Sequence, residues 1–205
     1  MGTAMTIFTE VGEIGIRAGN SMYLLRPSLH AMAQLGEPAE IVQTFANVMQ
    51  GDFLDSLGVL YACCEDDISD LYGSYEPGAF GGLRYVPGTA PITHIVPLAQ
   101  CLMRHGVVGV AKPLPRRADA EDQYLTEFDA KEHAALAMAH LGLTEREAWN
   151  MTMTGLAAAL RAKFPPSSKD SPGARAPTKE EHEATEAWYE RVLEARASRK
   201  NKTIH

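Results

Sequence analysis

The stretch MYLLRPSLHAMAQL at residues 22–35 decides the fold, because it takes the chain from a strand directly into a helix. Its first four residues are apolar and compatible with a β-strand. Pro27 disfavours the helical backbone region at Arg26, so extended geometry has to persist to that point, and proline itself fits the first turn of a helix. Apolar residues at helical spacing then mark one face of a short helix that ends at Gly36.

A second strand is predicted immediately before this stretch. Residues 11–17, VGEIGIR, place Ile14 and Ile16 on one side of an alternating pattern, and AGNS at 18–21 supplies turn residues. The two strands therefore form a β-hairpin, which is marginal alone and needs a helix or another strand to cover its apolar face.

Most of the chain from residue 37 to residue 164 is predicted to be helical. Pro38 begins a helix that Gly51 ends, and Asp52 is a good N-cap for a helix over 53–65. The apolar stripe of that second helix is Leu54, Leu57, Leu60 and Tyr61. Further helices are expected over 95–105 and 129–141, and after the capping residues Thr144 and Thr152.

Two internal segments are predicted to be irregular or extended. Residues 72–94 are punctuated by Gly and Pro, so we expect a long loop whose aromatic residues, Tyr72, Tyr75, Phe80 and Tyr85, hold it to the body. A short extended piece is expected over 107–112.

The C-terminal part is predicted to be a separate helix. Residues 165–177, PPSSKDSPGARAP, have the composition of a linker, and residues 178–205 hold an amphipathic helix and a tail. The fold class is thus mainly α (α+β): an N-terminal β-hairpin and a helical body in one domain over 1–164, then the linker and the C-terminal helix.

Composition excludes several function classes. The formal net charge is -7, which disfavours general nucleic-acid binding because that requires a cationic surface. No apolar run is long enough to span a bilayer, and the N-terminus lacks the pattern of a secretory signal. The three cysteines, Cys63, Cys64 and Cys101, are expected to be reduced thiols of a cytosolic protein.

No motif indicates catalysis, a metal or another cofactor. His133 and His140 are seven residues apart, whereas zinc-binding pairs usually lie three to five apart and need further ligands. The acidic residues between 65 and 70 lack the glycine and closing glutamate of a calcium loop. No nucleophile signature is present, and nothing in the sequence favours a paired-carboxylate hydrolase, although any fold can bring two acids together.

Candidate partner-binding residues lie in two places. One is the methionine cluster around Trp149, since flexible thioethers suit adaptable binding surfaces, although they more often fill a core. The other is the apolar face of the predicted C-terminal helix, which either docks on its own body or binds a partner. The predicted residues are Met138, Trp149, Met151, Met153, Trp188, Tyr189 and Val192.

Two regions, 11–66 and 129–164, resemble the tail assembly chaperones of long-tailed bacteriophages, prophages and gene transfer agents. In that family a small hairpin leads through an LRPS-type junction into helices, as in GNSMYLLRPSLHAMAQLG at 19–36. The second similarity is a helix, an LGLS-type turn, an aromatic residue and a helix that begins at threonine, as in HLGLTEREAWNMT at 140–152. The region 72–128 has no counterpart in this resemblance.

The resemblance implies a non-enzymatic chaperone in the host cytoplasm that is absent from the mature virion. Its implied partners are the tape measure protein, which it would keep soluble, the tail tube protein, a frameshifted longer form of itself and further copies of the chain. A minor structural tail component retained in the virion is one alternative function. A helix-turn-helix DNA-binding regulator using residues 132–163 is another, although the helices after the turn hold few cationic residues.

Overall fold

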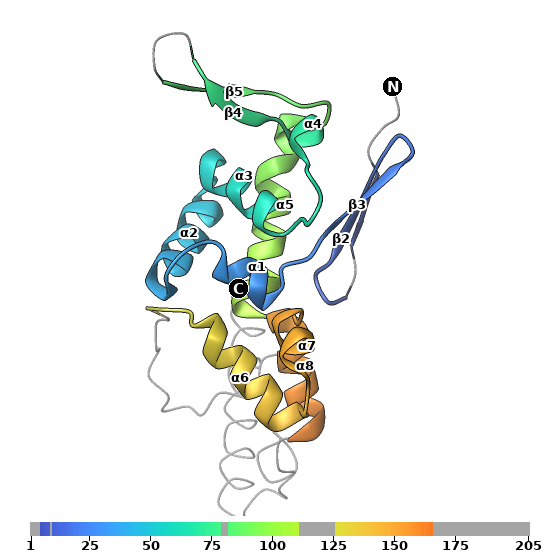
Figure 1. The fold of residues 1–205 in the computed structure, drawn as a ribbon, viewed down its shortest axis with the longest axis vertical. Helices are drawn as coiled ribbons and strands as arrows, with labels where there is room; N and C mark the ends of the chain where they lie inside the picture. The colour runs from blue at the N-terminus through green and yellow to red at the C-terminus, as the bar shows by residue number, and fades with distance from the viewer. Residues whose placement is uncertain (1–4, 9, 79–81, 111–125, 166–205) are drawn as a thin grey trace, which may run out of the picture. The chain divides into compact units, whose positions relative to one another are not determined.

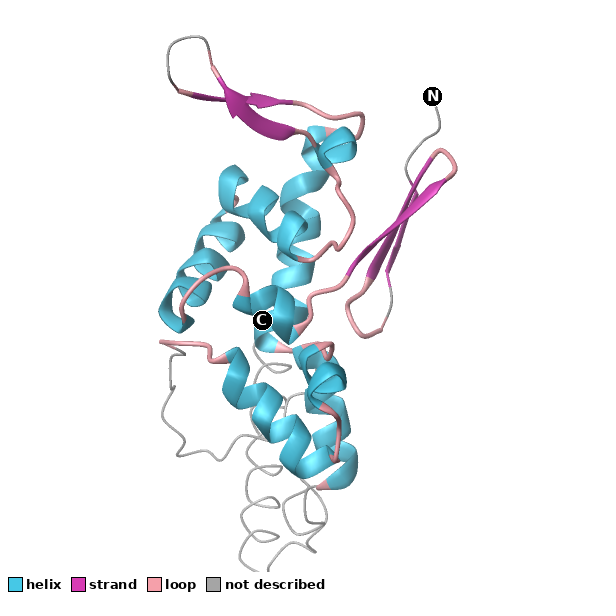
Figure 2. Ribbon diagram, in the orientation of Figure 1, coloured by secondary structure: helices cyan, strands magenta, loops and turns pink. Residues whose placement is uncertain are grey.

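The computed structural model describes residues 5–8, 10–78, 82–110 and 126–165. The chain divides into two units, and the larger one consists of Met1–Pro113 and Asp119–Phe164. This unit is mainly helical and has a short antiparallel sheet at its N-terminus, as Figures 1 and 2 show. The predicted fold class is therefore confirmed, whereas the linker and the C-terminal helix lie outside the described residues.

The predicted N-terminal hairpin is present and is part of a three-stranded sheet. Strands β2 (Ile14–Ala18) and β3 (Ser21–Leu25) pair antiparallel, and Ala18 faces Ser21 at the turn. Strand β1 (Met5–Phe8), which the sequence did not predict, pairs with the other edge of β2. Ile14 and Ile16 are fully buried, so the predicted inward face of β2 is confirmed.

The strand-to-helix junction has one difference from its prediction. Helix α1 (Leu29–Ala33) begins after Ser28, whose hydroxyl oxygen accepts a hydrogen bond from the backbone N–H of Ala31 at 3.1 Å. Pro27 thus precedes the N-cap, and the prediction that it lies in the first turn is wrong. A serine cap satisfies an N–H group that the helix leaves without a partner, and this decides where the helix begins.

The next two helices begin where the sequence predicts. Helix α2 (Pro38–Gln50) begins at a capping box of Glu37 and Glu40 and ends at Gly51 in the left-handed conformation, with φ of 91°. Helix α3 (Phe53–Ala62) is capped by Asp52 and ends three residues before the predicted limit. It packs on α5 (Ile95–Met103), and both helices contribute fully buried residues to one core.

The segment 72–94 is not the predicted loop. Helix α4 (Ser69–Tyr72) is followed by a second antiparallel hairpin, β4 (Ser74–Pro77) with β5 (Leu83–Val86), and by a 3₁₀ turn, η1 (Ile92–His94). The prediction that aromatic residues hold this segment to the body is confirmed for Tyr72, which is buried in the core, and for Tyr85, whereas Phe80 lies outside the described residues. The Tyr85 hydroxyl donates to the backbone oxygen of Tyr72 at 2.6 Å, and its ring lies edge-on to Phe53 at 4.9 Å.

A π-helical turn, η2 (Arg104–Val108), continues α5, so the extended piece predicted from residue 107 is wrong up to Val108. His105 in this turn lies against Gly12, where a β-carbon would come within 2.3 Å of the histidine β-carbon. Its Nδ1 atom is 2.9 Å from the hydroxyl oxygen of Thr154, which also accepts a hydrogen bond from the backbone N–H of Val110.

Burial lowers the pKa of His105, which predicts a pH dependence of stability. In the unfolded chain this histidine takes up a proton below about pH 6.5, whereas in the folded protein it stays neutral to a lower pH. The unfolded state therefore binds more protons in acid, and we expect the free energy of unfolding to decrease as the pH falls below about 6.5. Denaturation at several pH values should show a smaller decrease for His105→Gln, and equal decreases would contradict the prediction.

Three further helices complete the unit, and their predicted caps are confirmed. Helix α6 (Ala130–Leu141) is capped by the carboxylate of Asp129, and α7 (Glu145–Trp149) by a capping box of Thr144 and Glu147. Helix α8 (Met153–Lys163) is capped by Thr152.

Candidate functional site

The two regions that carry the family resemblance meet in the fold. The backbone N–H of Leu29 donates to the backbone oxygen of Met151 at 2.8 Å, and Ser28 and Thr152 form an isolated antiparallel bridge. The buried Thr152 hydroxyl donates to the backbone oxygen of Val11 at 2.9 Å. The segment before α1 and the segment before α8 thus form one joint, although more than a hundred residues separate them in the sequence.

Four of the predicted partner-binding residues lie at or near this joint, and all are half-buried against the core: Met138, Trp149, Met151 and Met153. The ring of Trp149 lies edge-on to His30 of α1, with ring centres 6.2 Å apart. The structure therefore gives these side chains a packing role, and their binding role stays a prediction. Trp188, Tyr189 and Val192 lie outside the described residues.

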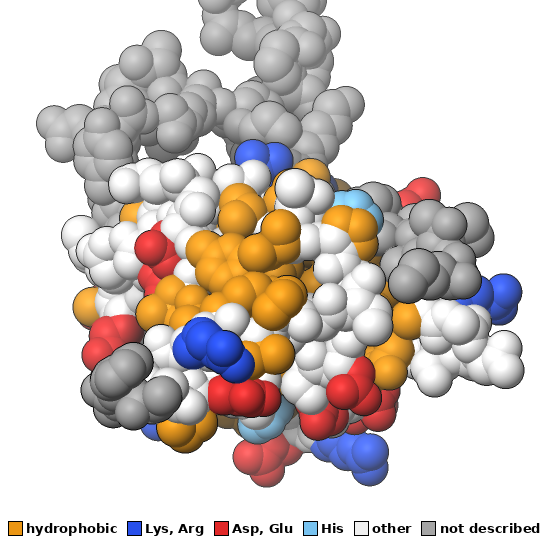
Figure 3. All heavy atoms as spheres, turned by 90° about the horizontal axis from the view of Figure 1, so that it is seen from above, with side chains coloured by type: hydrophobic (Ala, Val, Ile, Leu, Met, Phe, Trp, Pro, Cys, Tyr) orange, Lys and Arg blue, Asp and Glu red, His pale blue; other side chains and the backbone are white. Residues whose placement is uncertain are grey.

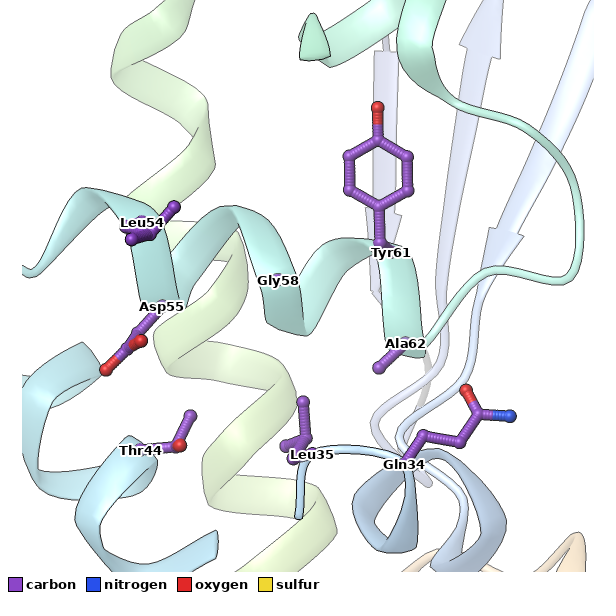
Figure 4. Close-up of a pocket in the computed structure, with 8 residues that line it drawn as sticks. All are labelled: Gln34, Leu35, Thr44, Leu54, Asp55, Gly58, Tyr61 and Ala62. Atoms are coloured by element: carbon purple, nitrogen blue, oxygen red, sulfur yellow. The ribbon is translucent and has the colours of Figure 1, made fainter. Parts of the chain in front are cut away.

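A shallow groove follows the outer surface of α3. It consists of two adjoining cavities, of about 540 Å³ and 370 Å³, that share Leu54, Gly58 and Tyr61. We call it the α3 groove. The larger cavity is bordered by Gln34 and Leu35, which connect α1 to α2, and by Thr44 of α2 (Figure 4). The smaller cavity extends to Ser74 and Tyr75 of β4.

The floor of the α3 groove is apolar and exposed. Leu54, Gly58 and Tyr61 follow one side of the helix at the spacing of successive turns, as Figure 4 shows. Leu54 is 58% exposed, so the prediction that its side chain belongs to the buried stripe of this helix is wrong. Leu57 and Leu60 of the predicted stripe are buried, which confirms that part of the prediction, and Val59 is buried with them.

The wall formed by the second hairpin is fixed by hydrogen bonds. The hydroxyl of Tyr61 donates to the backbone oxygen of Gly73 at 2.7 Å, which joins the floor of the α3 groove to the residue before β4.

Figure 3 looks onto the end of the unit that carries β4, β5 and α4 in Figure 1, and it shows hydrophobic side chains gathered in the middle of that face. This end of the unit presents apolar surface to solvent.

The charges at the α3 groove are negative. Of the described residues that line the two cavities, only Asp55 is charged, and its Oδ2 accepts a hydrogen bond from Asn47 at 2.7 Å. Asp67 adjoins the smaller cavity, because its Oδ1 accepts from the backbone N–H of Ser69 at 2.8 Å. Burial raises the pKa of Tyr61, and the negative charge of Asp67 raises it further. The arrangement suits a partner with cationic side chains.

The described part of the chain offers no centre for metal chemistry. It contains no group of three His, Cys, Asp or Glu residues placed to hold a metal ion. The Nδ1 atom of His133 donates to the backbone oxygen of Asp129 at 2.7 Å, and His140 lies edge-on to Phe164.

Burial raises the pKa of Cys63 far above its ordinary value, which keeps this free thiol protonated and unreactive. Among the described residues, no helix is long and apolar enough to cross a membrane.

The fold and the site define a mainly helical α+β protein with an exposed apolar groove. A family of unknown function, DUF6246, matches residues 50–184, and the chain belongs to this family. The matched region begins at the end of α2 and includes all of α3, and thus the floor of the α3 groove. No curated protein and no solved structure matches the chain.

Proposed function

We propose that this protein is a tail assembly chaperone of a long-tailed bacteriophage or prophage, and that it acts by binding rather than by catalysis. It would bind the tape measure protein in the host cytoplasm, keep that protein soluble, and help to recruit the tail tube protein. The proposal is supported by the sequence resemblance of residues 11–66 and 129–164 to such chaperones.

The observation that carries the binding function is the α3 groove. Covering the exposed side chain of Leu54 alone would contribute roughly 1–2 kcal/mol to an association. Such a contribution is moderate for each copy, so each one can still be released, and copies that associate with one another along a long partner gain avidity. The net charge of -7 keeps a complex with an aggregation-prone partner dispersed.

Co-expression with the tape measure protein tests this function. We expect the soluble fraction of the tape measure protein to increase at least several-fold in the presence of this chain, because its apolar helices are covered. The readout is the amount of tape measure protein in the cleared lysate that co-purifies with the tagged chain. No increase and no co-purification would contradict a chaperone function.

Mass spectrometry of purified virions separates the chaperone from the alternative of a minor tail component. A chaperone leaves before the particle is complete, so its peptides should be absent, whereas a structural component should be present in fixed proportion to the tail tube protein.

A further inference from the structure

We propose that the α3 groove receives one amphipathic helix of the partner, with a small residue over Gly58 and with Lys or Arg along the flank of that helix. This inference rests on the proposed function, because it names the kind of segment of the tape measure protein that would be bound.

The shape of the α3 groove favours close approach at Gly58. A glycine inside an exposed helix is unfavourable, because it gains nothing from side-chain burial and loses more backbone entropy than other residues. No atom lies within 4 Å of the position that a β-carbon at Gly58 would take, so packing within the described residues does not require glycine there. Leu54 and Tyr61 stand on either side of it, which leaves a gap that admits the surface of another helix.

The surroundings of the α3 groove favour a helix over other ligands. An extended peptide would pair with a strand edge, and the outer edge of the nearest strand, β4, is only four residues long and ends at Pro77, which has no N–H to donate, so it offers few backbone hydrogen bonds. A small molecule is usually bound in a site that covers most of its surface, whereas this floor remains open at Leu54. Helix-in-groove binding requires an apolar surface with flanking polar groups, and these are present here.

The carboxylates at the α3 groove determine which side chains should flank the apolar stripe of the bound helix. Asp55 borders the larger cavity and Asp67 adjoins the smaller one, so both ends of the α3 groove carry a carboxylate. Among the described residues, the lining offers no cation to neutralise an acidic ligand. A helix with Lys or Arg beside its apolar stripe therefore complements the α3 groove, whereas a second copy of this acidic chain is a poorer match.

A bulky substitution at the gap tests the placement. Gly58→Gln puts a good helix former at an exposed position, so we expect the denaturation midpoint of the free protein to stay equal or to increase. The side chain fills the gap, and we expect the tape measure protein co-purified from the lysate to decrease about ten-fold or more. The matched control is Ala135→Gln, which adds the same side chain at an exposed position of α6 and should leave co-purification unchanged.

The outcomes distinguish this inference from the proposed function. If wild type and both variants capture the tape measure protein equally, the chaperone function stands and the α3 groove is not its binding site. If none of the three captures it, the proposed function fails. If sedimentation shows that wild type is a dimer and Gly58→Gln a monomer, the α3 groove joins copies of this chain, and the inference is overturned.

The double variant Asp55→Asn with Asp67→Asn tests the charge. Each amide keeps an oxygen acceptor for Asn47 or the Ser69 N–H, so the fold should be preserved. The probes are synthetic 20-residue peptides that together cover the tape measure protein. The peptides that bind wild type should be amphipathic and basic, and the variant should bind them several-fold more weakly at low salt, with less salt dependence. Binding of acidic peptides, or unchanged salt dependence, would overturn the assignment of the flanks.

Discussion

Replacing Thr152 by valine is expected to lower the free energy of unfolding by about 2–3 kcal/mol, because one hydroxyl makes two structural hydrogen bonds. It accepts from the backbone N–H of Gly155 at 3.1 Å and thereby caps α8. It donates to the backbone oxygen of Val11 at 2.9 Å and thereby attaches the N-terminal sheet. Valine has nearly the same shape and removes both bonds without creating a large cavity.

The control is Thr144→Val, because the Thr144 hydroxyl also accepts from a backbone N–H of its helix, that of Glu147, but it is exposed and donates to the Glu147 side chain of the same turn rather than to a distant segment. This change should cost about 1 kcal/mol, which is the usual effect of losing a cap. Thr152→Ser keeps the hydroxyl and should lose much less stability than Thr152→Val. Urea denaturation of the variants measures all of these differences, and equal losses at positions 144 and 152 would contradict a larger contribution of the buried bond to Val11 than of the exposed bond to Glu147.

The joint at Thr152 also shows what could be predicted from the sequence. The caps at Asp52, Asp129, Thr144 and Thr152 were predicted correctly, because a cap depends on side chains within three or four residues of it. The contact between Thr152 and Val11 was not predicted, because it joins distant parts of the chain. Pro27 was misplaced since two local signals compete there, and the serine that follows decides the start of the helix.

The hairpin of β4 and β5 was missed for a different reason. Its strands have only four residues each, and Gly and Pro surround them, so no alternating pattern develops. The hairpin depends on tertiary contacts, such as the hydrogen bond from Tyr85 to the backbone oxygen of Tyr72.

The α3 groove was missed because α3 is apolar on several sides. Periodicity then identifies a helix but not which of its sides is covered, and Leu54 was assigned to the wrong one. The available signal was Gly58, an unfavourable residue in the middle of a predicted helix.

Gly73→Ala is expected to have the largest effect, on the order of 3–5 kcal/mol of lost stability. The backbone of Gly73 has φ of 79° and ψ of 173°, a region that is almost exclusive to glycine. A β-carbon there would lie 2.2 Å from the backbone oxygen of Val86 and 2.9 Å from the hydroxyl of Tyr85. The alanine variant must therefore displace the hairpin, and with it the wall of the α3 groove that Ser74 and Tyr75 form.

The variant Gly51→Ala separates backbone strain from steric overlap as causes of the lost stability. Gly51 also has a positive φ, of 91°, but no atom lies within 4 Å of its β-carbon position. The alanine substitution at this position should therefore lower stability only through backbone strain, by about 1–2 kcal/mol. Thermal denaturation gives the stabilities, and hydrogen exchange of the β4 and β5 amides reports the hairpin itself. Because the hairpin is a wall of the α3 groove, Gly73→Ala should also reduce capture of the tape measure protein at temperatures where the core remains folded. Equal stability losses for the two variants would mean that the hairpin yields without cost and does not shape the groove.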